Sequence, residues 1–246
     1  MKQEEYGKMR DQEDHYWWFI SRRKLALALL DPVLNQNPAA KVLDVGCGTG
    51  AMLQALDGQC EATGLDFSED ALRYCRERGL NHLIDGNAEQ IPLASNQFDA
   101  VVSLDTIEHV PGDAAAASEI YRVLKPGGVF VMNVPAYKWL WGPHDIALMH
   151  QRRYTTREVR TLLENAGFRL EKLSYSVFFL FPVVAVRRFF EKFHHGPAQV
   201  KLPEVSEGTQ TRLIRLMDKE AALFRRMNLP WGSSVVAVAR KPKGSP

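Results

Sequence analysis

Three glycines at alternate positions follow a short apolar run, and this stretch limits the folds open to the chain more than any other. Residues 42–45 predict a buried strand that carries one acid, Asp44. Gly46, Gly48 and Gly50 come next, and good helix formers follow them. Glycine has no Cβ, so the backbone of such a strand–turn–helix unit can approach a ligand closely. A tight turn without a ligand is the alternative interpretation.

The residues around this turn favour a nucleoside ligand. The spacing GxGxG differs from the dinucleotide fingerprint GxGxxG, and the Gly-Lys-Ser/Thr of a phosphate-binding P-loop is absent. The next apolar run, 62–65, ends in Asp66, which lies 20 positions after Gly46. In nucleotide-binding α/β folds, an acid at the end of the second strand accepts hydrogen bonds from ribose hydroxyls. Ser68 then predicts the N-cap of a helix.

Three later segments complete an ordered set of motifs, at 86–93, 98–105 and 122–128. Together with the glycine turn and Asp66, they resemble the class I S-adenosylmethionine-dependent methyltransferases. The similarity is to the branch that contains ubiquinone-pathway and related small-molecule enzymes, and it covers about residues 38–175. The resemblance implies S-adenosylmethionine as cofactor. It also implies an α/β, Rossmann-like fold with a seven-stranded, mostly parallel sheet, helices on both faces and an antiparallel last strand pair.

Alternating strand and helix patterns agree with a parallel sheet. The expected strands lie near 41–45, 62–66, 82–84, 98–103, 128–134, 169–175 and 234–240. Thr155 or Thr156 predicts the start of a helix, and Gly167 its end. The expected divisions are an N-terminal helical cap over 1–37, a core over 38–176 and 233–241, an insertion over 177–232, and a tail over 242–246. The insertion is aromatic and basic, which suits a lid on the acceptor side or an interface.

Composition narrows the cellular setting. The formal net charge of +2 offers no case for nucleic acid as a partner. Cys47, Cys60 and Cys75 form no CxxC pair, which suits a reducing compartment and argues against a zinc site. The first five residues are too polar for a signal peptide, and the longest apolar run, 177–186, is shorter than the roughly 20 residues that span a bilayer. We expect a cytoplasmic protein, with contact to a membrane surface through 177–195 and a homodimer as further expectations.

The resemblance assigns cofactor contacts to individual residues. Asp66 would bind the ribose diol, and Asp44 would face the amino group of the cofactor. Asn87 stands where the family often has Asp, and its side-chain oxygen can still read the adenine. Arg22 or Arg23 would hold the cofactor carboxylate, although both also suit the surface of a helix. The expected cofactor-binding residues are Arg22, Asp44, Gly46, Cys47, Gly48, Gly50, Asp66, Phe67, Asn87, Ala88, Leu104 and Asp105.

A hydroxyl acceptor must also lose its proton, and a positioned base contributes about 10²–10⁴-fold to the rate of such a step. The candidate catalytic bases are His109, His144 and His150. The last two lie in a loop, 139–154, that is dense in aromatic rings, imidazoles and guanidinium groups and is expected on the acceptor side. Arg152 and Arg153 could hold a carboxylate or phosphate of the acceptor, or could be a solvated pair at a helix start.

A metal site needs consideration at Asp105, Glu108 and His109. Ubiquinone-pathway O-methyltransferases carry a carboxylate-x-x-Glu-His arrangement that can hold a divalent ion, and this chain has that spacing. Many metal-free relatives also have Glu-His at this place. We therefore expect no metal and a packing or hydrogen-bonding role for His109 near the cofactor.

The predicted function is S-adenosylmethionine-dependent methyl transfer to a small-molecule or lipid-like acceptor, as O-methylation with a histidine as general base. Alternatives are N- or C-methylation of a small molecule, or a non-catalytic scaffold that keeps the cofactor fold. The Asn/Asp-Pro-Pro-Tyr tetrapeptide of base N-methyltransferases is absent after the fourth strand. A long basic stripe is absent too, which argues against RNA as acceptor.

Overall fold

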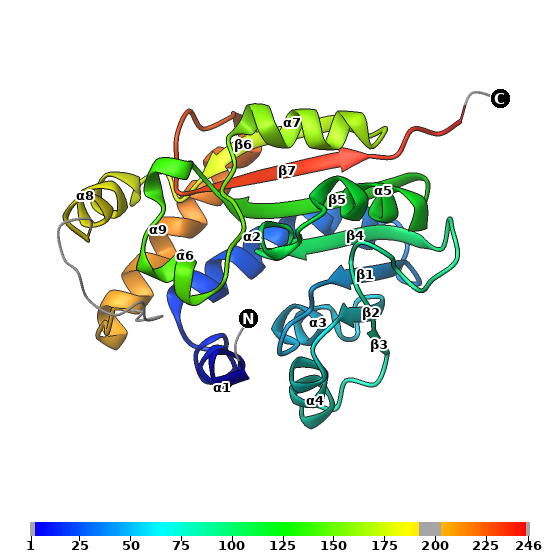
Figure 1. The fold of residues 1–246 in the computed structure, drawn as a ribbon, viewed down its shortest axis with the longest axis horizontal. Coiled ribbons are helices and arrows are strands. Elements are labelled where there is room, and N and C mark those ends of the chain that lie inside the picture. The colour runs from blue at the N-terminus through cyan, green and yellow to red at the C-terminus, as the bar shows by residue number, and fades with distance from the viewer. Residues whose placement is uncertain (1–2, 192–202, 245–246) are drawn as a thin grey trace.

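Seven strands form one sheet in the computed structural model, which describes residues 3–191 and 203–244 (Figure 1). The strands are β1 (Lys41–Val45), β2 (Glu61–Asp66), β3 (Leu83–Asp85), β4 (Phe98–Leu104), β5 (Leu124–Pro135), β6 (Arg169–Ser176) and β7 (Ser234–Arg240). Their order in the sheet is β3-β2-β1-β4-β5-β7-β6. Strand β7 runs antiparallel to both β5 and β6. The fold class predicted from the sequence is confirmed.

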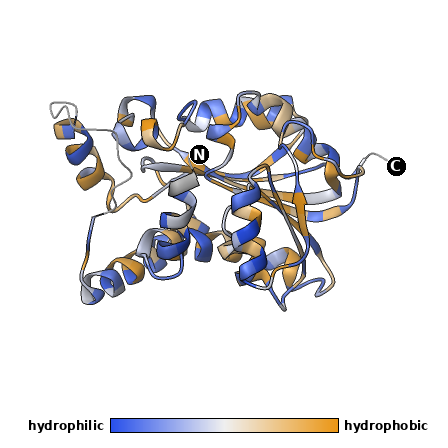
Figure 2. Ribbon diagram, turned by 60° about the horizontal axis from the view of Figure 1, so that its bottom comes forward, coloured by the Kyte–Doolittle hydropathy of each residue, from blue (hydrophilic) through white to orange (hydrophobic). Residues whose placement is uncertain are grey.

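Helices cover both faces of this sheet because successive strand residues point to opposite sides. Leu43 packs in a cluster with residues of α5 (Asp113–Val123) and α7 (Thr156–Asn165). The adjacent Val42 packs instead with residues of α2 (Trp17–Leu34) and α3 (Ala51–Leu56). Apolar residues gather in the central strands between these two helical layers (Figure 2). The strands are therefore buried on both faces, as parallel strands usually are.

Local signals in the sequence locate most element ends. The Ser68 hydroxyl accepts a hydrogen bond from the amide of Ala71 at the start of α4 (Glu69–Glu77). Thr155 and Glu158 form a capping box at the start of α7, and Gly167 follows its end with φ +97°. Strand β5 begins earlier than expected, at Leu124, because this residue already pairs with Phe98 of β4 before a bulge.

The region between β6 and β7 divides into two helices with different surroundings. Helix α9 (Glu207–Arg226) packs along α2, where Lys24 pairs with Asp218 at 3.1 Å and Phe224 is fully buried. This part of the expected insertion therefore belongs to the packed body of the protein. Helix α8 (Phe181–Glu191) has no buried residue. The expected membrane-contact segment, 177–195, is described only as far as Glu191.

The N-terminal helices also differ from each other. Helix α2 packs on the sheet, whereas α1 (Gln3–Gln12) packs on α4. Short helical turns follow the carboxyl ends of two central strands: η1 (Ile107–His109) after β4, and η2 (Lys138–Leu140) and α6 (Pro143–Ala147) after β5. Among the helices described, none has both the length and the apolar character needed to cross a membrane.

Candidate active site

A cavity of about 1020 Å³ lies beyond the carboxyl ends of the central strands. Open α/β sheets commonly bind ligands at this edge. Most of the residues predicted for the site line it: Arg22, Gly46, Gly48, Asp66, Phe67, Asn87, Ala88, Leu104, Asp105, His109, His144 and His150. The structure thus brings together segments that are up to 128 positions apart, from Arg22 to His150.

The glycine turn forms one wall of this cavity through its backbone. The amide of Gly46 donates to the Leu65 carbonyl at 2.7 Å, and the amide of Gly48 donates to Asp66 Oδ2 at 2.9 Å. Gly46 and Gly48 have φ values of +75° and +55°, which L side chains rarely adopt. A Cβ added at Gly48 would lie 2.7 Å from Met9 Cε. The turn therefore needs glycine for its conformation, and at Gly48 the end of the flexible Met9 side chain lies close to it.

Asp66 connects this turn to the end of β2. Its Oδ1 accepts from the Ser68 amide at 3.0 Å, and its Oδ2 accepts from Gly48. The residue is only 5% exposed, and burial raises the pKa of its carboxyl above the usual range. A carboxylate has about four acceptor positions, so two backbone donors leave capacity for the hydroxyls of a ligand.

Three of the expected cofactor residues do not line the cavity. Asp44 is 2% exposed in the middle of β1, where burial raises the pKa of its carboxyl to about 8. The side chain of Cys47 packs with Leu53 and Cys75 in an apolar cluster behind the turn. Gly50 is the N-cap of α3 with φ +90°. In this structure their place is behind the wall, where they support the turn.

Arg22 rather than Arg23 reaches the cavity. The Arg22 guanidinium forms an ion pair with Asp105. Arg23 does not line the cavity and instead donates a hydrogen bond, 3.0 Å long, to the Glu13 carbonyl. Burial lowers the pKa of Arg22 to about 10, and its Nε has no hydrogen-bond partner in the described chain. Asp105 has φ +51° and accepts from Asn133 Nδ2 at 2.6 Å. An orphaned guanidinium nitrogen fits a ligand that carries a carboxylate.

Asn87 and Glu89 form a small local network at the adenine side predicted for the cavity. Asn87 Oδ1 accepts from the Glu89 amide at 2.9 Å, and Asn87 Nδ2 donates to Glu89 Oε2 at 3.2 Å. Glu89 Oε1 in turn accepts from the Gly112 amide at 2.8 Å. Asn87 Oδ1, which we expected to bind the adenine, therefore already accepts a hydrogen bond from Glu89 and keeps one lone pair for a second donor.

On the opposite side of the cavity, Asp145 orients His150. Asp145 is fully buried, and its Oδ1 lies 2.8 Å from His150 Nδ1. Arg153 donates to both carboxylate oxygens, at 2.7 and 3.1 Å, and the Gly142 amide donates at 2.9 Å. Burial alone would raise the pKa of Asp145, but the hydrogen bonds from His150 and Arg153 hold it well below its usual range. An ionised carboxylate can only accept, so His150 Nδ1 donates the hydrogen of this bond.

The two other candidate bases lie beside His150 in a dry environment. Burial, with the nearby His150, lowers the pKa of His109 to about 3. Burial, with the nearby Arg188, lowers the pKa of His144 to about 4. The ring of His150 lies 4.6 Å from that of His109 and 6.3 Å from that of His144, nearly perpendicular to both. His109 and His144 are therefore neutral and weakly basic at neutral pH.

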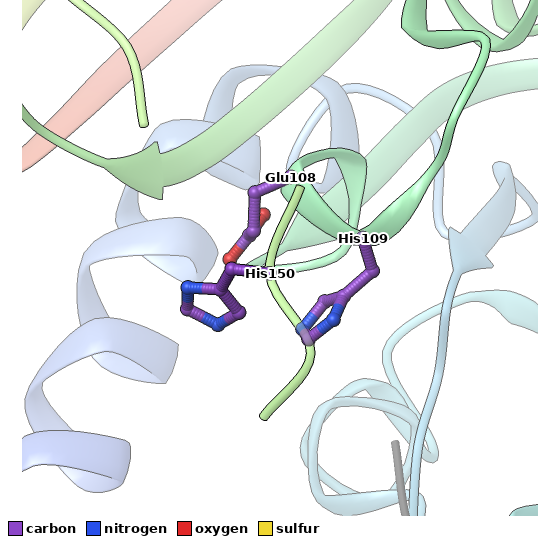
Figure 3. Close-up of side chains that lie close together, drawn as sticks. All are labelled: Glu108, His109 and His150. Carbon is purple, nitrogen blue, oxygen red and sulfur yellow. The ribbon is translucent and has the colours of Figure 1, made fainter. Parts of the chain in front are cut away.

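Glu108 is the unexpected member of this cluster (Figure 3). It is fully buried, burial raises its pKa to about 8, and neither carboxyl oxygen has a hydrogen-bond partner within the described residues. Ligand atoms of Glu108, His109 and His150 lie within 4.8 Å of one another. Asp105 is held by Arg22 and Asn133 instead. A cation would thus find a different set of ligands from the Asp105-x-x-Glu108-His109 set considered from the sequence.

The adjacent arginines are both used inside the chain. Arg153 is bound to Asp145 and donates to the Ala136 carbonyl at 2.9 Å. Arg152 pairs with Asp113 at 2.7 Å and donates to the Pro111 carbonyl. The expectation that these guanidinium groups hold an acceptor anion has no support in this geometry, because each is already neutralised.

Sequence reasoning missed two parts of the site. Helix α1 supplies Tyr6 and Met9 to the cavity wall, and the following Glu13 binds the Thr49 hydroxyl and Arg78. The i, i+3 spacing of two apolar residues in a polar helix could have indicated this. The pairing of Asp145 with His150 was the second omission, and only their spacing of five residues hinted at it.

Comparisons with known proteins agree with this arrangement. Residues 43–132 match the family model described as a methyltransferase domain. The chain is 32% identical over 166 residues to a "probable S-adenosylmethionine-dependent methyltransferase" of Mycolicibacterium smegmatis, an alignment that covers 65% of this chain and 62% of the relative. It is 34% identical over 139 residues to malonyl-acyl-carrier-protein O-methyltransferase of Enterobacter lignolyticus, covering 52% of this chain and 55% of the relative. The chain thus spans little more than half the length of the curated relatives that it matches.

A solved structure shows the same fold at low identity. Phosphoethanolamine N-methyltransferase 2 of Haemonchus contortus, in complex with S-adenosyl-L-methionine, is similar with a TM-score of 0.58 and 18% identity, over 88% of this chain and 52% of that one. The glycines, Asp66 and the unpaired Arg22 nitrogen fit a ligand with a diol and a carboxylate, as S-adenosylmethionine has. Residues 43–132 therefore form a methyltransferase domain, and the sheet has the fold of a solved S-adenosylmethionine-bound methyltransferase.

Proposed function

We propose that the protein transfers a methyl group from S-adenosylmethionine to an oxygen atom of a small or lipid-like acceptor, with His150 as general base. The observation that carries this proposal is the Asp145–His150 hydrogen bond in the wall of the cavity that also contains the glycine turn and Asp66. It fixes the orientation of the His150 imidazole beside the predicted cofactor site. The roles of the individual cofactor residues are part of the proposal.

The protein contributes binding, orientation and a proton acceptor. S-adenosylmethionine, when bound, supplies an activated methyl group for in-line displacement. Gly48, Asp66 and Arg22 would fix its position, which is the main source of rate in such reactions. His150 Nε2 takes the proton of the acceptor hydroxyl, and Asp145 stabilises the resulting imidazolium. His109 and His144 have pKa values of about 3 and about 4, so they would serve as neutral walls of the acceptor site.

The size of the cavity and the character of the relatives support the acceptor class. Ligand pockets commonly enclose roughly 300–1000 Å³, and this cavity of about 1020 Å³ has room for two ligands. One relative is by name an O-methyltransferase of malonyl-acyl-carrier-protein, which carries its acyl group on a large partner. A small or lipid-like acceptor is consistent with both. A cytoplasmic location, a membrane contact and a homodimer stay predictions, as does the absence of a bound metal.

Labelled methyl transfer from S-adenosylmethionine to fractionated metabolites and lipids tests the activity. The His150→Ala protein should turn over about 10²–10⁴-fold more slowly than the parent on the acceptor found. Matched His109→Ala and His144→Ala proteins should lose less, since their rings are not oriented by a carboxylate. Cofactor binding by calorimetry should stay unchanged in all three.

Three results would contradict the proposal. If the pure parent protein does not bind S-adenosylmethionine in calorimetry, the proposed cofactor is wrong. If His150→Ala keeps full turnover, the assignment of His150 as general base is wrong. Methylation on a nitrogen or carbon atom of the acceptor would show one of the alternative reactions in place of O-methylation.

A further inference from the structure

Helix α8 exposes an apolar stripe to the outside, whereas a surface helix of a water-soluble domain usually exposes its polar side. Its residues Val183, Val186 and Phe190 are 67%, 57% and 58% exposed. Their spacing of three and four residues puts them on one stripe of the helix. A helix at the protein surface normally turns such a stripe toward the core and its charges toward water. Here the apolar stripe faces outward.

Two of the charged residues of α8, Arg188 and Glu191, lie on its inner side. Val184, Arg188 and Glu191 line the cavity, and Arg188 Nη1 pairs with Glu191 Oε2 at 2.9 Å. These positions follow each other at intervals of four and three residues, on the side away from the apolar stripe. One side of α8 therefore forms part of the wall of the acceptor cavity, and the other presents apolar side chains outward.

The mouth of the cavity adjoins this helix. Arg187 and Met149 both line the cavity, and the Arg187 side chain is 51% and Met149 52% exposed. Side chains that share a cavity and the outer surface lie where the two meet. Trp139, 49% exposed, contacts Phe181 at the start of α8 with ring centroids 6.0 Å apart. We call the group Trp139, Met149, Val183, Val186, Arg187 and Phe190 the α8 surface.

The charges around the α8 surface favour an anionic occupant. Arg187 and Arg188 both pair with Glu191, at 2.7 and 2.9 Å, and Lys138 of the adjoining η2 is exposed. One acid cannot neutralise three cations, so this group keeps an excess of positive charge. The acid of α6, Asp145, is fully buried and bound to Arg153. A symmetric contact with a second copy of the chain would bring the same positive charges together. Negatively charged lipid headgroups would neutralise them instead.

We propose that the α8 surface binds an anionic lipid bilayer, with α8 lying in the plane of the headgroups. Eleven residues make a helix of about 16 Å, which is too short to cross the roughly 30 Å hydrocarbon core of a bilayer. Aromatic and aliphatic side chains then enter the acyl boundary, and the arginines remain at the headgroups. The cavity mouth faces the same layer, so a lipid-like acceptor passes from the bilayer to His150. Only this last consequence rests on the proposed function, because the lipid contact itself requires no methyl transfer.

Flotation of the whole chain with vesicles tests the contact. The protein should float with vesicles of phosphatidylcholine and phosphatidylglycerol, and less with phosphatidylcholine alone. Val183→Glu and Val186→Glu should each lower the bound fraction about tenfold, because a carboxylate replaces an apolar group at the acyl boundary. Met227→Glu is the matched control, since Met227 is 50% exposed but lies at the end of α9. Val186→Leu should bind as the parent does.

Each remaining outcome is decisive. Absence of flotation with either vesicle, or equal flotation of parent and Val186→Glu, overturns the proposal. A dimer by sedimentation velocity that Val186→Glu converts to monomer would assign the surface to a second copy instead. Calorimetry with S-adenosylmethionine separates the two proposals: lipid binding without cofactor binding would sink the methyl-transfer function alone. Cofactor binding without flotation would sink the lipid contact alone.

Discussion

The proposed cofactor half and the proposed acceptor half of the cavity are built in different ways. The cofactor half comes from consecutive strand ends, and its main contacts are backbone amides, such as the Gly48 amide on Asp66. The acceptor half comes from side chains of separate segments, with Glu108 after β4, His150 after β5, and Arg188 on α8. A backbone-built site leaves a motif in the sequence, whereas a site built from distant side chains leaves only scattered residues.

The two halves also differ in how their charges are satisfied. Arg22 and Asp105 form an ion pair in the cofactor half, and one guanidinium nitrogen is left for a ligand. In the acceptor half, burial lowers the pKa of His109 and raises that of Glu108, so both are neutral at neutral pH. The cofactor half is thus suited to a charged ligand, and the acceptor half to a neutral one that must give up a proton.

Replacing the residue that orients the base should have the largest effect. Asp145→Asn lets His150 take the other tautomer, and we expect turnover to fall by about 10²–10⁴-fold. The calorimetric affinity for S-adenosylmethionine should not change, which would confine the effect to the acceptor half. A merely structural role would be indicated if cofactor affinity fell in parallel, or if the pH profile of the residual activity matched that of the parent.

The next largest effect should appear in cofactor affinity. Asp66→Ala removes a charged hydrogen-bond acceptor from the cavity wall, and we expect the dissociation constant to rise roughly 10- to 100-fold. Asp70→Ala, on the adjacent helix α4 but outside the cavity, is the control. Equal affinities of parent and Asp66→Ala would mean that Asp66 does not contribute to the cofactor half of the cavity.

A smaller effect, on the free energy of unfolding, should separate the conformational role of Gly48 from its role in the cavity wall. Gly48→Ala should lower the free energy of unfolding by about 1–2 kcal/mol, because L residues disfavour positive φ. Gly58→Ala pays the same backbone cost at φ +71°, but a Cβ there meets nothing within 4 Å. Denaturant unfolding should show similar losses, while cofactor affinity falls only in Gly48→Ala. Equal cofactor affinity in both would show that Gly48 serves the fold alone.

Glu108 should make stability depend on pH. Its pKa is about 8 in the folded protein against an ordinary 4.5, so the folded state holds the proton more tightly. Stability from this group is therefore lost as the pH rises from about 4.5 to about 8. Glu108→Gln keeps the neutral form, and its melting temperature should exceed that of the parent at pH 9.

At pH 5 the Glu108→Gln and parent proteins should melt together. Glu207→Gln, an exposed change at the start of α9, should not alter the pH dependence. A constant difference between parent and Glu108→Gln at every pH would mean that packing, rather than the proton, separates them.

The sequence predicted the sheet and most of the cofactor half. Strand patterns located all seven strands within a few residues, and Ser68, Thr155 and Gly167 indicated helix ends. The exceptions have physical causes. Strand β5 starts early because Leu124 pairs across a bulge, and no local pattern encodes such a pairing. Helix α9 was not predicted, although Ser206 caps it and Met217 and Phe224 recur at helical spacing. Only its packing on α2, which joins residues nearly 200 positions apart, lies beyond local signals.

The choice among the three histidines could not be made from the sequence. His109, His144 and His150 are equivalent as residue types, and they differ only in burial and partners. Asp145 orients His150, while burial keeps the other two neutral. The same reason applies to Arg22 and Arg23, which are neighbours in the chain but point to different places.

The sequence alone determined the backbone turn at Gly46–Gly50, the acid at the end of β2 and the family to which they point. These features depend on local conformation and on the regular geometry of adjacent parallel strands. The tertiary structure decided which imidazole is paired with a buried carboxylate, which arginine lines the cavity and which side of α8 faces outward. Those properties depend on desolvation and on contacts between distant segments, and neither can be inferred from neighbours in the chain.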